Sequence, residues 1–153
     1  MSTVSQRLAA LRGAMEAAGV AAYLIPTGDP HSSEYLPAHY NSREYFSGFT
    51  GENSTLVVTM EGSALWADGR FFVQAEKELA GTEIELMRMG EPGVPTVEEY
   101  CAAHLAEGQS LGLCGLTASC LLVRELQKVL DPKGVEVRTL TLEDQLWVEG
   151  RPA

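Results

Sequence analysis

The sequence is poor in basic residues, and what it has is not gathered in one place. Its 153 residues include 11 Lys and Arg against 21 Asp and Glu, a net charge of −10. Residues 1–76 hold 4 basic and 8 acidic side chains, and residues 77–153 hold 7 and 13, so neither half is basic. Nucleic acids and anionic membrane surfaces attract clustered Lys and Arg, so we expect neither as a partner.

Cysteine is scarce and carries no metal-binding or redox pattern. The 3 cysteines, Cys101, Cys114 and Cys120, are an odd number, and none belongs to a CxxC pair. Small buried hydrophobic residues in a reducing compartment are the simplest interpretation of such cysteines. We therefore expect a cytoplasmic protein without a disulfide framework.

Long apolar runs are also absent. Met1 to Gly13 carries two arginines and lacks the apolar core of a secretory signal. The least charged stretch, Gly108 to Val123, has too few residues to span a bilayer and contains polar side chains. We expect a chain that is not inserted in a membrane.

The composition is otherwise that of a globular domain, with 45% hydrophobic and 21% charged residues. A chain of this length buries roughly 70% of its unfolded surface without needing disulfides or metals. Periodicity and turn residues predict helices at 3–18, 41–47, 68–80, 96–105, 121–130 and 142–148, and strands at 21–25, 55–59, 63–66, 83–89, 111–114 and 135–140. Thr96 and Glu99 predict a capping box at the start of one helix, and the alternating pattern of 83–89 predicts a half-exposed strand near a sheet edge. The tight turn at Met60–Gly62 cannot join parallel strands. We predict an α/β, single-domain layered fold with a mixed five- or six-stranded sheet flanked by helices.

Common catalytic and nucleotide-binding motifs are missing. There is no GxGxxG, no GxxxxGK[ST] and no HExxH. His31, His39 and His104 are scattered, and such histidines are more often structural than metal-ligating. Cys101 falls in an amphipathic helix and Cys114 in a buried strand, positions that disfavour a reactive thiolate. The motifs thus indicate no catalytic residue and no metal ligand, and a cysteine–histidine pair that meets only in the folded chain stays open as an alternative.

Two polar clusters are candidates for a site. The wholly apolar run at 21–25 predicts a strand buried on both faces. Pro26–Tyr35 is a polar loop that follows this strand, a usual place for sites in α/β sheets, although it also fits a turn-rich structural loop. The second cluster is Leu65–Phe72. There Asp68 can cap a helix, Gly69 allows close backbone approach, and Arg70 offers a planar fork of donors for a carboxylate or carbonyl. From the residues alone, Arg70 fits this role and pairing with a nearby acid equally well.

Several motifs occur in a fixed order over residues 3–152: Tyr23–Asp29, His31 with Ser33–Tyr35, Arg43 with Phe46–Gly51, Trp66–Phe72 with Gln74–Ala75, Leu86–Gly90, and Leu146–Trp147 with Arg151–Pro152. With these motifs the chain resembles the N-terminal, creatinase-like domain of Xaa-Pro aminopeptidases, especially the large cytosolic type. It departs from the family at Glu52–Ser54, where relatives usually have a small Ser-Ala-Gly run.

The resemblance implies a division of labour between domains. Residues 3–148 would form the creatinase-like N-terminal domain, and residues 149–153 would begin a linker. The family's catalytic pita-bread domain, which is absent from this chain, holds two Mn-type ions and hydrolyses the peptide bond before a penultimate proline. The chain itself is expected to be a non-catalytic domain without a cofactor, which shapes substrate access and assembly.

The resemblance also implies roles for particular residues. Arg70 would reach the substrate-binding region and hold a peptide carbonyl or carboxylate. Asp68 and Trp66 would support Arg70, and His31 and Glu34 are weaker candidates for residues that line the same substrate-binding region. The expected partners are the downstream domains, a peptide with a penultimate proline, and a second copy in a homodimer.

Two alternatives stay open. The chain fits a free-standing binding or scaffold module that uses the loop at residues 27–41. It also fits the related N-terminal domain of a prolidase or of a creatine amidinohydrolase. Metal identity and peptide-length preference are not determined by the sequence.

Overall fold

A computed structural model describes residues 4–26, 46–49, 54–60, 62–67, 69–114 and 120–140. The loop at residues 27–41, the helix expected to begin at Asn41 except for residues 46 and 47, the helical turn expected at 142–148 and the linker start at 149–153 lie outside them. The elements in chain order are α1 (Val4–Ala18), β1 (Ala22–Pro26), β2 (Thr55–Thr59), β3 (Ser63–Ala67), the 3₁₀ turn η2 (Gly69–Phe71), α3 (Phe72–Leu79), β4 (Ile84–Arg88), α4 (Val97–His104), β5 (Ser110–Cys114), α5 (Cys120–Leu130), the 3₁₀ turn η3 (Asp131–Lys133) and β6 (Glu136–Leu140).

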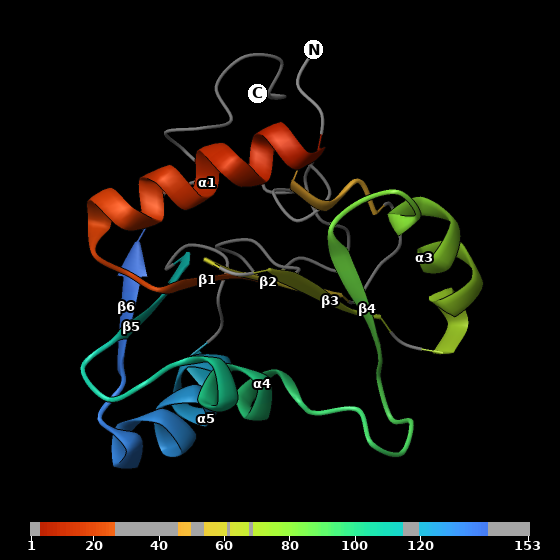
Figure 1. Ribbon diagram of the computed structural model, residues 1–153. Coiled ribbons are helices and arrows are strands. Elements are labelled where there is room, and N and C mark those ends of the chain that lie inside the picture. Colours follow the sequence, from red (N-terminus) through yellow and green to blue (C-terminus); the bar gives the residue numbers. More distant parts are fainter. Residues whose placement is uncertain are drawn as a thin grey trace.

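The strands form one six-stranded sheet in the order β4-β3-β2-β1-β5-β6 (Figure 1). Strand β2 runs antiparallel to both of its neighbours, β1 and β3, whereas β3–β4, β1–β5 and β5–β6 are parallel pairs. The predicted mixed sheet is confirmed, and so is the hairpin that joins β2 to β3. The segment expected to lie near a sheet edge is β4, which is an edge strand.

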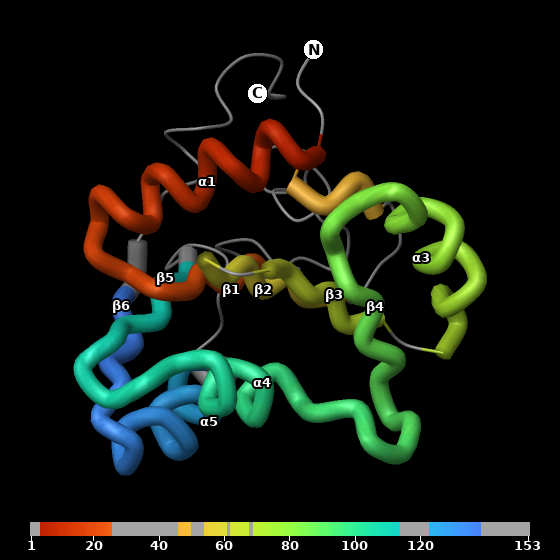
Figure 2. The backbone as a smooth tube through the Cα atoms, viewed as in Figure 1, coloured from red at the N-terminus to blue at the C-terminus, as the bar shows by residue number. Residues whose placement is uncertain are grey.

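Helices cover both faces of the sheet. Figures 1 and 2 show α1 on one face and α4 with α5 on the other, while α3 lies beside β4. Strand β1 is buried on both sides because Tyr23 and Ile25 join the core under α1, whereas Ala22 and Leu24 join the core against α4 and α5. The wholly apolar sequence of this strand therefore reflects its central position, as predicted.

Helix ends follow the local signals in the sequence. At the start of α4 the Thr96 hydroxyl accepts from the Glu99 amide at 3.1 Å, and the Glu99 carboxylate accepts from the Thr96 amide at 3.1 Å. This is the predicted capping box. Helix α1 ends before Gly19, whose φ of 79° suits glycine. Arg138 of β6 donates to the Ala18 carbonyl at 2.7 Å and so places a cation at the negative end of α1.

Candidate functional site

The described part of the predicted site lies at the carboxyl end of β3. All five residues of this strand are buried, and the 3₁₀ turn η2 then brings the chain to the surface with Arg70 exposed. The sequence predicted a helix capped by Asp68. Instead, α3 begins at Phe72, its N-cap position is Phe71, and no side chain caps it, because the 3₁₀ turn occupies the first positions. Asp68 itself lies outside the described residues.

Trp66 points into the core. Its side chain is 2% exposed, and its indole Nε1 donates to the Pro95 carbonyl at 2.9 Å. The ring meets Tyr100 of α4 edge to face, with 5.0 Å between centroids. Trp66 thus joins the end of β3 to the segment that leads into α4, and its ring is closed to a molecule approaching from solvent.

Arg70 is exposed, and its guanidinium lies over the ring of the next residue. Its Cζ is 5.4 Å from the centroid of the Phe71 ring, within the range of a cation–π contact. The Phe71 ring in turn meets Phe49 edge to face at 6.3 Å, and Phe49 is 0% exposed. The ring contact is not the whole environment of Arg70, which makes a further interaction.

A second arginine occupies the neighbouring strand. Arg88, the last residue of β4, pairs with Ala67 in the sheet register, and its Cζ lies 5.5 Å from the centroid of the Phe72 ring. The charge of Arg88 is compensated by an ion pair with Glu76 of α3. The two guanidinium groups therefore lie over neighbouring phenylalanine rings at adjacent strand ends.

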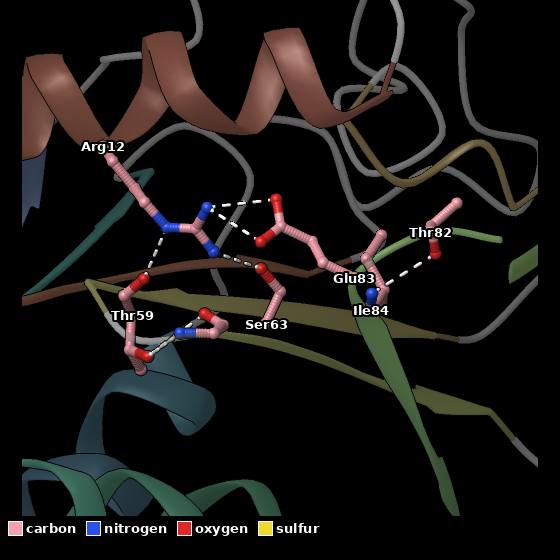
Figure 3. Close-up of polar contacts among 7 residues, drawn as sticks. Arg12, Thr59, Ser63, Thr82, Glu83 and Ile84 are labelled. Atoms are coloured by element: carbon pink, nitrogen blue, oxygen red, sulfur yellow. Dashed lines mark hydrogen bonds and ion pairs between the residues drawn. The ribbon is translucent and has the colours of Figure 1, made fainter.

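The opposite end of β3 is held by Arg12 of α1 (Figure 3). Its Nε donates to the Thr59 carbonyl at 2.8 Å and its Nη2 to the Ser63 hydroxyl at 2.9 Å. Its Nη1 donates to both carboxylate oxygens of Glu83, at 3.0 and 3.1 Å. One guanidinium thus ties α1 to the β2–β3 hairpin and to the residue before β4. No motif in the sequence points to Arg12 for this role.

The remaining candidates contribute no geometry. His31 and Glu34, like Asp68, lie outside the described residues, so only Trp66 and Arg70 of the candidate set can be located. The structure places these two on different sides of the strand end, one inside the core and one at the surface.

Cys101 does not carry a reactive thiol, and the described part of the chain holds no metal-ligand cluster. Cys101 is buried, and desolvation, followed by the Glu98 charge, raises the pKa of its thiol to about 12. The thiol is therefore protonated at neutral pH and unsuited to nucleophilic attack.

Across residues 4–140, apart from the undescribed gaps, no group of three or more His, Cys, Asp or Glu side chains could hold a metal ion. Among the helices described, none has the length and apolar character to cross a membrane.

Comparison with known proteins gives a consistent match. The family model of the creatinase/prolidase N-terminal domain matches residues 7–143. The chain is 42% identical to aminopeptidase P2 of Arabidopsis thaliana over 97% of its own length, which is 22% of that relative. It is 39% identical to a probable Xaa-Pro aminopeptidase P of Pyricularia oryzae over 100% of its length, which is 25% of that relative. The chain thus spans about a quarter of these curated relatives.

Solved structures agree with the sequence match. The X-prolyl aminopeptidase of Caenorhabditis elegans, described as a cytosolic enzyme with a di-nuclear active site, superposes with a TM-score of 0.90 at 30% identity. The superposition covers 100% of this chain and 26% of that one. The N-terminal domain of the cytoplasmic peptidase PepQ of Mycobacterium tuberculosis has the same fold, with a TM-score of 0.65 at 24% identity over 97% of that chain. A domain with this fold has therefore been crystallised separately from the rest of its protein.

Proposed function

The chain belongs to the creatinase/prolidase N-terminal domain family, and from this premise we propose that it serves as the non-catalytic N-terminal domain of a metal-dependent Xaa-Pro aminopeptidase. The observation that carries the proposal is the match of essentially the whole chain to about a quarter of such aminopeptidases. The protein would remove an N-terminal residue that precedes proline, and this domain would shape substrate access and assembly.

The chemistry of hydrolysis would belong to another part of the same protein. Two Mn-type ions there would polarise the peptide carbonyl and activate water. Support comes from the Caenorhabditis elegans relative, which is described as having a di-nuclear active site. The same relative is cytosolic, which supports a cytoplasmic location. The partners would be the downstream domains and, in a homodimer, a second copy.

Arg70 is our candidate for the residue that this domain lends to substrate binding. Its exposed guanidinium, at the carboxyl end of β3, can donate two parallel hydrogen bonds to a peptide carbonyl or carboxylate. Trp66 and Asp68 would support it, and the buried position of Trp66 fits that role. His31 and Glu34 remain candidates for residues that line the same substrate-binding region.

The proposal is tested by comparing this chain with the complete protein that we propose contains it. Both are incubated with Mn²⁺ and with Xaa-Pro dipeptides, longer Xaa-Pro peptides or creatine. We expect the complete protein to cleave the longer peptides and this chain alone to cleave none. Cleavage restricted to dipeptides would indicate a prolidase instead, and turnover of creatine would indicate an amidinohydrolase. Turnover by the chain alone would contradict a non-catalytic role.

A further inference from the structure

An exposed arginine has many rotamers, and fixing its fork in one direction costs conformational entropy. A substrate-binding arginine is therefore more effective when neighbouring groups fix its stem before the substrate arrives. Arg70 has such a neighbour, because its guanidinium carbon lies 5.4 Å from the centre of the Phe71 ring. This contact limits the directions that the guanidinium can take.

The Phe71 ring is itself fixed from below. It meets Phe49 edge to face, with an interplanar angle of 84°. Phe49 is fully buried, and its amide donates to the Ser47 hydroxyl at 3.1 Å. Gly48 lies between Ser47 and Phe49 and has a φ of 76°, and a Cβ atom added to Gly48 would lie only 3.3 Å from the side chain of Val4 in α1. The segment that carries Phe49 is therefore packed closely against α1.

We infer that Phe71 is a positioning residue: its ring, mounted on Phe49, sets the direction in which Arg70 presents its guanidinium to the peptide. The inference rests on the proposed role of Arg70. Phe71 need not touch the substrate itself. Its effect should appear in the binding of the peptide and only while Arg70 is present.

Phe72 supplies a matched control. It is as partly buried as Phe71 and also lies beneath an arginine, at 5.5 Å from Arg88. That arginine is additionally held by its ion pair with Glu76. Removing the Phe72 ring therefore takes away the aromatic contact of an arginine while leaving Phe71 in place beside Arg70.

The experiment measures KM and kcat of the complete protein for a Xaa-Pro peptide in a double-mutant cycle of Arg70→Ala and Phe71→Leu. Phe71→Leu removes a cation–π contact at the surface. The binding free energy of such a contact corresponds to a rise in KM of about two- to five-fold, and kcat should not change. In the Arg70→Ala background the same substitution should add nothing. Phe71→Tyr should restore the wild-type KM, and Phe72→Leu should leave it unchanged.

Each other outcome overturns a particular step. If Arg70→Ala raises KM but Phe71→Leu does not, the inference is wrong and the role of Arg70 stands. If Arg70→Ala itself has no effect, the proposed role of Arg70 is wrong. An equal rise of KM for Phe71→Leu in both backgrounds would show that the ring acts through the fold. Should Phe71→Leu prevent folding, Phe71→Met replaces it with a flexible apolar side chain and is judged by the same outcomes.

Discussion

Replacing Arg70 with alanine in the complete protein is expected to raise KM for a Xaa-Pro peptide by about 10- to 150-fold, with kcat nearly unchanged. Hydrogen bonds to charged groups contribute about 1.5–3 kcal/mol, which corresponds to this range. The loss falls on KM because, in the proposed role, Arg70 holds the peptide and takes no part in cleaving it. Steady-state kinetics with a peptide of fixed length measures the effect.

Two further variants separate the fork of Arg70 from its charge. Arg70→Lys keeps the charge but loses the planar pair of donors. Its KM should therefore fall between that of the wild type and that of Arg70→Ala. Arg88→Ala removes a guanidinium from the adjacent strand end that already forms an ion pair with Glu76, and it should leave KM unchanged. A wild-type specificity constant for Arg70→Ala, or an equal loss for Arg88→Ala, would remove the special role of Arg70.

Replacing Trp66 with alanine should lower the free energy of unfolding of this chain by about 3–5 kcal/mol, because a large buried side chain is lost and a cavity remains. The indole is 2% exposed and packs against Tyr100. Trp66→Phe should lower the free energy of unfolding by less, because it keeps an aromatic ring in the core. It should still be destabilising, because the Pro95 carbonyl loses its hydrogen-bond donor. Urea unfolding of the chain followed by circular dichroism measures both values.

Val73 provides the control for this series. It lies in the first turn of α3 and is 66% exposed, so Val73→Ala should change the free energy of unfolding by no more than about 0.5 kcal/mol. In the complete protein, Trp66→Phe should leave KM unchanged if Trp66 supports the fold without contacting peptide. A Trp66→Ala variant as stable as Val73→Ala would contradict the core position of Trp66.

Features that depend on neighbouring residues could be predicted from the sequence. The Thr96 and Glu99 capping box needs side chains three positions apart, and both bonds are present. The apolar run of β1 predicted a strand buried on both faces, and it lies in the middle of the sheet. The mixed sheet followed from a tight turn between two strands, because such a turn fixes their direction.

Features that depend on distant residues could not. Arg12 contacts groups 47 to 71 positions away, and no spacing rule links them before the strands are paired. The contact of Phe71 with Phe49 likewise depends on how the two segments meet at the end of β3. The start of α3 was misplaced because a 3₁₀ turn and the first turn of an α-helix have similar sequence signals.

In the proposed function, Arg70 contacts the substrate of a reaction that another part of the protein carries out. The sharpest test is a crystal structure of the complete protein with a bound Xaa-Pro peptide. In that structure we expect a guanidinium nitrogen of Arg70 about 2.7–3.2 Å from a carbonyl or carboxylate oxygen of the peptide. A bound peptide that no atom of Arg70 contacts would contradict the proposed role of Arg70.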